Sequence, residues 1–196
     1  MATRTASPQP EPLRFATARA FESWLRKNHA SSDGIWLLIA KAGADKSTVS
    51  YPQAIEVALC YGWIDGQKKG LDEHHWLQRF TPRRARSLWS KVNREKAEAL
   101  IQSGRMQPSG MAQIERARAD GRWDAAYDGA RTAGVPPDLQ AALDARPKAR
   151  KFFEQLDAAN RYSVLWRVQT AKRPETRAKR IETLIDMLAR GEKIHG

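Results

Sequence analysis

Five consecutive apolar residues, Ile35 to Ile39, place the strongest constraint on how this 196-residue chain can fold. The run is far shorter than the roughly 20 apolar residues that a membrane-spanning helix needs. It lies between a turn at Ser31–Gly34 and a polar loop at Ala42–Thr48. A short segment that is apolar at every position is typical of a strand buried on both faces. We therefore expect an inner strand of a sheet, covered on both sides.

The segments on either side of this run predict two helices and three further strands. One helix is expected from about Thr17, as N-cap, to Asn28. A second should begin after Ser50, because Ser50 and Gln53 form a capping-box pattern, and should end near Tyr61 before Gly62. The other strands are expected at Leu13–Phe15, Trp63–Gln67 and His75–Phe80. The fold class that follows is α+β, with a small, mostly antiparallel sheet and packed helices in the N-terminal half.

From Ser87 onward the pattern is helical, so we expect an all-helical C-terminal region. Its clearest helix runs from Pro174 to Arg190 and has one apolar face, formed by Ala178, Ile181, Leu184, Ile185 and Leu188. Earlier helices are expected at about 90–103, 109–119, 135–143, 147–156 and 161–171. An alanine- and proline-rich stretch, 130–149, marks a boundary. We expect a disordered tail (1–12), an α+β body (13–130) and a helical module (135–193).

Charge is the most prominent feature of the composition. Thirty-four Lys and Arg residues against twenty-two Asp and Glu give a formal net charge of +12. This charge favours association with nucleic acid, anionic lipid or acidic protein, but it identifies no site. A basic composition that serves no partner is the alternative interpretation.

The single cysteine, Cys60, excludes an intramolecular disulfide and fits a reducing compartment. The proline-punctuated N-terminus lacks the apolar core of a secretory signal. We therefore expect a cytoplasmic protein without a membrane span. Neither phosphate-binding glycine motifs nor zinc-ligand spacings occur, so we expect no cofactor and no metal site.

A candidate ligand site begins at Trp63 and Asp65, which share one face if this segment is a strand. A carboxylate beside a large aromatic ring needs a partner, and Arg79 and Arg83 follow soon after. An ion pair or a turn cap that fixes the hairpin to the helix behind it is one interpretation. The other is a pocket for a polar or anionic ligand, lined by Trp63, Asp65, Arg79, Arg83, Trp89 and Asn93.

The segment from Arg79 to Lys96 offers an alternative function. It holds seven Lys or Arg residues and one acidic residue, Glu95, interleaved with Phe80 and Trp89. Basic residues with aromatic ones can bind phosphates and stack bases. A solvent-exposed basic face with two core aromatics gives the same pattern, so nucleic-acid binding is possible but not favoured.

Several blocks in a fixed order resemble one protein family. They are Tyr51–Ala54, Ala58–Gly66, Arg79–Arg83, Ser87–Asn93, Gly104–Met106, Gly121–Trp123 and Ala171–Arg177. Together they resemble the bacterial YdeI/OmpD-associated family, also called the bacteriocin-protection family, over about residues 13–193.

The resemblance implies a C-terminal family module at about 135–193 and a link, by name, to bacteriocin protection and an outer-membrane porin. It supplies no catalytic residues. Family descriptions favour the periplasm, whereas this chain lacks an export signal, and we retain the cytoplasm. The first hypothesis is a non-catalytic binding protein in stress or antimicrobial-peptide protection, with a protein partner or an anionic small ligand. A small-molecule sensor or enzyme around Asp65 and Arg83, and a nucleic-acid-binding protein, are the alternatives.

Overall fold

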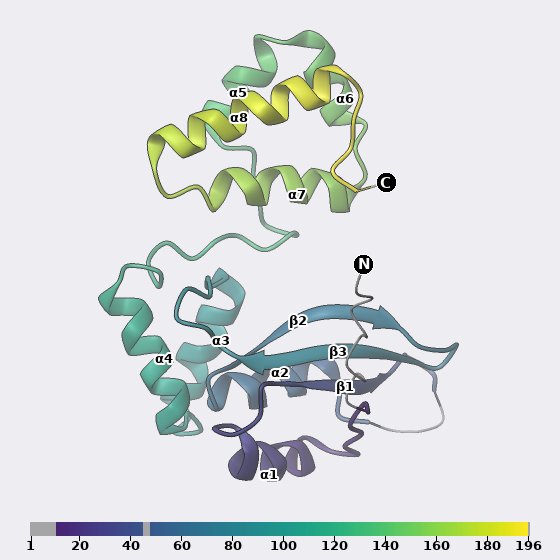
Figure 1. Ribbon diagram of the computed structural model, residues 1–196, viewed down its shortest axis with the longest axis vertical. Helices are drawn as coiled ribbons and strands as arrows, with labels where there is room; N and C mark the ends of the chain where they lie inside the picture. Colours follow the sequence, from purple (N-terminus) through teal and green to yellow (C-terminus); the bar gives the residue numbers. More distant parts are fainter. Residues whose placement is uncertain (1–10, 45–47, 196) are drawn as a thin grey trace, which may run out of the picture. The chain divides into compact units, whose positions relative to one another are not determined.

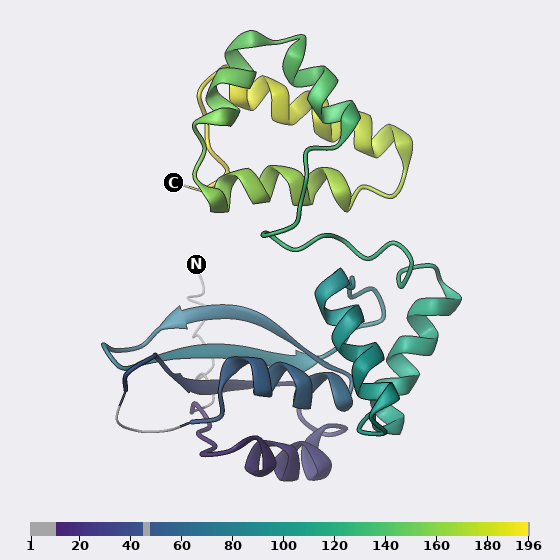
Figure 2. The same ribbon diagram turned by 180° about the vertical axis from the view of Figure 1, so that it is seen from behind.

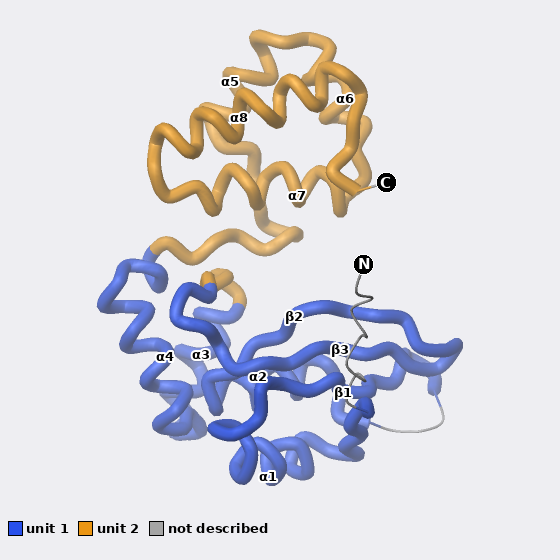
Figure 3. The backbone as a smooth tube through the Cα atoms, in the orientation of Figure 1, with its two compact units in different colours: residues 1–87, 93–124 blue, residues 88–92, 125–196 orange. Residues whose placement is uncertain are grey.

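The structure is a computed structural model that describes residues 11–44 and 48–195. Most of the expected tail (1–12) and part of the expected loop at Ala42–Thr48 lie outside these residues. The chain forms two compact units (Figure 3). Unit 1 comprises the described residues up to Ser87 together with Asn93–Asp124, and unit 2 comprises Leu88–Val92 together with the described residues from Ala125 onward.

Unit 1 contains a three-stranded antiparallel sheet (Figure 1). Its strands are β1 (Ile35–Ala40), β2 (Trp63–Gly70) and β3 (His75–Pro82), in the order β1-β3-β2. An irregularity in the β2–β3 register falls between Asp65 and Lys68. This sheet and the helical C-terminal half confirm the expected α+β class.

Strand β1 lies at an edge of the sheet, so the expected inner strand is wrong in its position. Instead of a strand at Leu13–Phe15, Leu13 alone bridges to Leu37, with hydrogen bonds from Leu13 N to Trp36 O (2.8 Å) and from Leu38 N to Leu13 O (2.9 Å). One face of β1 is fully buried, and on the opposite face Trp36 is buried, with Lys69 over its ring, while Leu38 and Ala40 are half-buried. A strand that is apolar throughout is thus protected by side chains rather than by a second neighbouring strand.

Helices α1 (Ala18–Asn28) and α2 (Tyr51–Cys60) lie on one face of this sheet (Figures 1 and 2). From α1, Phe21 contacts Phe80 of the sheet with its ring, and Trp24 contacts Trp63. The expected capping box of α2 is confirmed, since Gln53 N donates to Ser50 Oγ and Ser50 N donates to Gln53 Oε1. Unit 1 continues with α3 (Lys91–Gln102), whose first two residues belong to unit 2, and α4 (Pro108–Ala119).

Helices α2 and α4 approach each other at two glycines. Gly62, two residues after the end of α2, has a φ of +75°, and a Cβ there would lie 2.8 Å from the carbonyl oxygen of Ser109. A Cβ on Gly110 would lie 2.7 Å from the carbonyl oxygen of Leu59 and still closer to that of Cys60. Both positions therefore require the absence of a side chain.

Unit 2 is built from α5 (Pro137–Asp144), α6 (Pro147–Glu154), α7 (Ala158–Gln169) and α8 (Pro174–Ala189). Four of the five residues predicted for the apolar face of α8 are buried, and Ala178 is exposed. Helix α7 begins three residues before the expected Arg161, because the side chain of Asp157 accepts a hydrogen bond from Asn160 N and caps it. The core of unit 2 comprises Leu139, Leu143, Ala149, Phe153, Val164, Leu165, Val168, Ile181, Leu184, Ile185 and Leu188.

The segment Leu88–Val92 is fastened to the chain around Tyr127. Backbone hydrogen bonds run from Tyr127 N to Trp89 O (3.0 Å) and from Lys91 N to Tyr127 O (2.8 Å). Lys91 also forms an ion pair with Asp128 at 2.7 Å. These bonds explain why a segment so far upstream belongs to unit 2. Throughout the described part of the chain, no helix has both the length and the apolar character needed to cross a bilayer.

Candidate functional site

Trp63 and Asp65 lie on the same face of β2, as predicted. Their partners in the register, Pro82 and Phe80, are two residues apart on β3. Trp63 is 1% exposed, and its Nε1 donates to the carbonyl oxygen of His29 at 3.1 Å. Asp65 is half-buried and accepts a 2.7 Å hydrogen bond from the hydroxyl of Tyr51, the first residue of α2. This bond ties the start of α2 to the sheet.

Arg79 lies on the opposite face of the sheet from Asp65. It pairs with Trp36 in the register, and its guanidinium lies 5.9 Å from the centre of the Trp36 ring. Since side chains alternate along a strand, Arg79 points away from the face that Phe80 and Asp65 share. Arg79 is therefore not the partner of Asp65, whose carboxylate accepts the hydroxyl of Tyr51 instead.

The other three candidates lie after β3. Arg83 is 5% exposed, and its backbone N donates to the carbonyl oxygen of Gly62 at 3.0 Å. Trp89 is 2% exposed and belongs to unit 2, whereas Asn93 is half-buried in the unit 1 part of α3. The ligand-binding roles of the six residues remain a prediction.

The basic segment 79–96 uses part of its charge inside the fold. Arg83 is buried, Lys91 pairs with Asp128, and Arg94 donates to the carbonyl oxygen of Trp123 at 3.3 Å. Nucleic-acid binding by this segment likewise remains a prediction. Cys60 is 4% exposed, and its burial raises the thiol pKa to about 11. Within residues 11–44 and 48–195, no three His, Cys, Asp or Glu side chains group as metal ligands would.

A cavity of about 640 Å³ in unit 1 lies beside the start of α2. The rings of Tyr51 and Trp76 line it, with centres 5.4 Å apart, and Lys68 Nζ lies 4.3 Å from the centre of the Trp76 ring. Asp65 therefore acts on this cavity indirectly, by orienting Tyr51. The two half-buried aromatic rings and two lysines, Lys41 and Lys68, give this cavity a partly aromatic, cationic lining.

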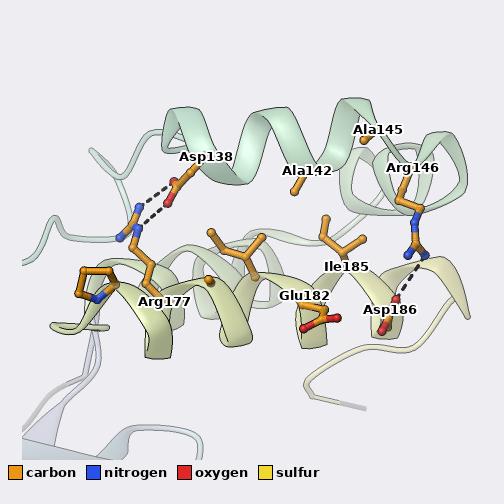
Figure 4. A pocket seen from close by; sticks show the side chains of 11 residues that line it. Asp138, Ala142, Ala145, Arg146, Arg177, Glu182, Ile185 and Asp186 are labelled. Carbon is orange, nitrogen blue, oxygen red and sulfur yellow. Dashed lines mark hydrogen bonds and ion pairs between the residues drawn. The ribbon is translucent and has the colours of Figure 1, made fainter.

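In unit 2, α5 and α8 border a second cavity, of about 520 Å³ (Figure 4). Its floor is apolar, with Ala142 and Ile185 among its residues. One end is closed by Asp138 and Arg177, joined by two hydrogen bonds, and the other by the ion pair of Arg146 with Asp186 at 3.3 Å. The Arg177 side chain donates a hydrogen bond to the Asp138 carboxylate and holds its pKa below the ordinary value. Both cations at the ends of this cavity are therefore matched by carboxylates.

A third and larger cavity, of about 870 Å³, lies along α7 and α8, and we call it the cationic pocket. No carboxylate is found among the described residues of its polar lining. The apolar lining consists of Leu88, Trp166, Leu184, Met187 and Ile194. The polar lining consists of Arg167, Thr170, Thr176, Lys179, Arg180, Thr183 and Lys193.

Among the described residues, no ion pair involves any of the four cations of this pocket. Arg180 donates to the carbonyl oxygen of Arg167 (2.7 Å) and to Thr170 Oγ1 (3.3 Å), and Arg167 donates to the carbonyl oxygen of Ser163 (3.2 Å). These acceptors are neutral, so they orient the two guanidinium groups without neutralising their charge. Lys193 adds a minor electrostatic contribution to the low pKa of Asp157, which hydrogen bonds from Asn160 chiefly cause. Positive charge thus accumulates around an apolar floor.

Sequence reasoning missed this pocket. The charges of the last helix alternate in sign, and that pattern predicts an ordinary solvent-exposed face. Lys179 and Arg180 become a site only because α7 runs alongside α8 and brings Arg167 and Trp166 to them. The available signal was Trp166 itself, a large aromatic that is 37% exposed.

Two family models match the chain, one on each side of the change from unit 1 to unit 2 at Asp124. A family model described as a domain of unknown function (DUF8412) matches residues 13–113. A second model, described as bacteriocin-protection, YdeI or OmpD-associated, matches residues 132–191. The resemblance seen in the sequence is confirmed for this C-terminal segment, while the blocks at 51–93 fall within the first match. No match was found among curated proteins or among solved structures.

Proposed function

We propose that this chain, which belongs to the family defined by the DUF8412 domain and carries a YdeI/OmpD-associated segment, is a non-catalytic binding protein. We propose further that its ligand is an anion. Its binding site is the cationic pocket of unit 2. The description of the C-terminal match names bacteriocin protection, and we propose a role of this kind, in antimicrobial-peptide or stress protection, for this chain.

One observation supports the proposal above the others. Four cations surround an 870 Å³ pocket whose lining includes no acidic residue. Pockets of this size that combine an apolar lining with a few convergent polar groups are the usual form of small-ligand sites. Arg167, Lys179, Arg180 and Lys193 match a carboxylate, phosphate or sulfate in charge.

The chemistry of the lining favours binding over catalysis. Among the residues that line the pocket are no His, Cys, Asp or Glu, the side chains that most often serve as general base or nucleophile. The arginines are oriented by backbone carbonyls, which fixes a binding geometry.

The net positive charge of the whole chain bears on how a protective role could work. Membrane-active antimicrobial peptides are commonly rich in Lys and Arg. A chain with a net charge of +12 repels such peptides. Protection by this protein would therefore proceed through an anionic ligand rather than through capture of a cationic peptide.

The proposal is tested with an aromatic anion, 8-anilinonaphthalene-1-sulfonate, whose fluorescence rises in apolar sites. Lys179→Glu should weaken its binding about fivefold or more, since one exposed charge contact amounts to about 1 kcal/mol in water. Lys148→Glu is the matched control, because Lys148 is exposed in α6 of the same unit and lines none of the cavities described above. Equal effects of the two variants, or no binding by the parent protein, would refute the proposal.

We also propose the cytoplasm as the compartment of this protein. The single, buried cysteine supports this proposal, since a reducing compartment leaves such a thiol free. Fractionation of cells that express the native chain tests it, and recovery in a periplasmic extract would contradict it.

A further inference from the structure

We propose that the ligand of the cationic pocket is a single-chain anionic amphiphile, with a carboxylate, phosphate or sulfate head on an acyl or alkyl chain. This inference rests on the proposed anion binding in the same pocket. It adds the chemical class of the ligand and the direction in which the ligand lies.

The head-group end is at the connection between α7 and α8. Arg167 and Thr170 lie at the end of α7, and Thr176, Lys179 and Arg180 lie in the first turns of α8. The hydrogen bonds from Arg180 to Arg167 O and Thr170 Oγ1 fix the two helices to each other at this point. Lys179 and Arg180 thus lie at this end of the pocket, whereas the Arg167 guanidinium reaches back along α7 to the carbonyl oxygen of Ser163.

The rest of the lining that the structure describes is largely apolar, with Lys193 as its one charged residue beside Ile194. Leu184 and Met187 follow along α8, and Ile194 and Leu88 complete this part of the lining. Met187 lies eleven residues after Thr176, which corresponds to roughly 16 Å along a helix. A compact anion such as phosphate would reach only the cationic end of a lining this long.

Two threonine hydroxyls of the lining already have hydrogen-bond partners within the protein. Thr183 Oγ1 donates to the carbonyl oxygen of Lys179 at 2.9 Å, and Thr170 Oγ1 donates to that of Trp166 at 2.8 Å. Both hydroxyls therefore donate to backbone carbonyls one turn back along the chain. On α7, Trp166 is 37% exposed and contacts Tyr127 edge-on at 6.2 Å. The ring of Trp166, held in this way, suits contact with the alkyl chain of a ligand better than contact with a second polar group.

The experiment is calorimetric titration of the full-length protein with acetate, octanoate, decanoate and dodecanoate, each below its aggregation concentration. Affinity should rise several-fold with each added methylene, up to the roughly fourfold that complete burial of a methylene gives. Decyltrimethylammonium, with a decyl chain and the opposite charge, should bind at least tenfold more weakly than decanoate.

Two variants separate head from chain. Lys179→Gln should lower the affinities for octanoate, decanoate and dodecanoate by a common factor and leave the gain per methylene unchanged. Met187→Gln, a change of similar length on the half-buried Met187, should reduce the gain per methylene and leave acetate binding unchanged. Circular dichroism confirms that both variants are folded.

The outcomes distinguish the amphiphilic ligand from anion binding as such. Equal affinities for acetate and dodecanoate, or an unchanged gain per methylene in Met187→Gln, would overturn the amphiphile and leave anion binding in place. Tighter binding of adenosine monophosphate than of decanoate would also overturn it. If neither the carboxylates nor 8-anilinonaphthalene-1-sulfonate bind, the proposed function itself fails.

Discussion

The close approach of α2 and α4 makes Gly110 the most informative single position in unit 1. Gly110 lies inside α4, where helix propensity alone favours Ala over Gly by about 1 kcal/mol. The structure makes the opposite prediction for Gly110→Ala. The added methyl would lie 2.6 Å from Met106 Sδ, 2.7 Å from Leu59 O and closer still to Cys60 O.

The expected magnitude follows from what can move. Met106 is a flexible side chain, but the two carbonyl oxygens belong to the last turn of α2, and Cys60 O also accepts a hydrogen bond from Gln107 N at 3.2 Å. Relief therefore requires that α2 and α4 separate. Overpacking of this kind costs about 3 kcal/mol at the upper end of its usual range. After subtraction of the propensity gain, we expect a net loss of about 2 kcal/mol, or about 4–8 °C in Tm for a chain of this size.

Urea denaturation followed by circular dichroism measures this loss as a lower midpoint at constant slope. Gly70→Ala is the matched control, because a Cβ at Gly70 meets no atom within 4 Å and its φ is not positive. The control should be as stable as the parent or slightly more stable. If Gly110→Ala is as stable as the parent, propensity outweighs packing, and the described approach of the two helices is wrong.

Three further predictions concern single side chains. Because burial raises the pKa of Cys60 to about 11, a thiol reagent at pH 8 should label it in denaturant and leave it unlabelled in the native protein; rapid native labelling would contradict its burial. Arg177 holds the pKa of Asp138 below its ordinary 3.8, so this pair stabilises the fold above about pH 4 and its contribution disappears as the pH falls through the lowered folded value. Since the Asp138 side chain is 45% exposed, Asp138→Asn should cost under about 1 kcal/mol of stability at pH 7 and nothing at the acid limit. Urea denaturation at several pH values measures this cost, and a cost that does not change with pH would refute the linkage. Tyr51→Phe removes the hydrogen bond to half-buried Asp65 and should cost about 1 kcal/mol in the same assay, and an unchanged midpoint would show that the bond contributes no net stability.

Local patterns were sufficient for most elements of the fold. The capping box at Ser50 and Gln53 and the glycine at position 62 place α2 almost to the residue, because these signals act within one turn of helix. Proline positions predict the start of α8 for the same reason. The face of α8 follows from its periodicity, although Ala178 is small enough to remain exposed without cost.

Long-range contacts were beyond the reach of the sequence. Nothing in the run Ile35–Ile39 shows that Lys69 and Arg79 cover Trp36, so an edge strand looked like an inner one. The attachment of Leu88–Val92 to Tyr127 uses backbone hydrogen bonds, which carry no side-chain signature.

The candidate site shows the same division. That Trp63 and Asp65 share a face followed from strand alternation, but the partner of Asp65 is Tyr51, from a helix, and Arg79 lies on the other face. The alternation of side chains along a strand could have excluded Arg79 as a neighbour of Asp65 only with the register of β2 against β3 in hand. That register has an irregularity after Asp65, which the sequence does not reveal. The cationic pocket depends on the packing of α7 against α8, which neither helix reveals alone.

The central claim is that an anionic amphiphile binds next to Trp166. The indole NMR signals of ¹⁵N-tryptophan-labelled protein test this claim most directly. Comparison with Trp166→Phe identifies the Trp166 signal among those of the seven tryptophans. The account predicts that decanoate shifts this signal saturably, while the signal of buried Trp63 stays in place. A stationary Trp166 signal at saturating decanoate would contradict it.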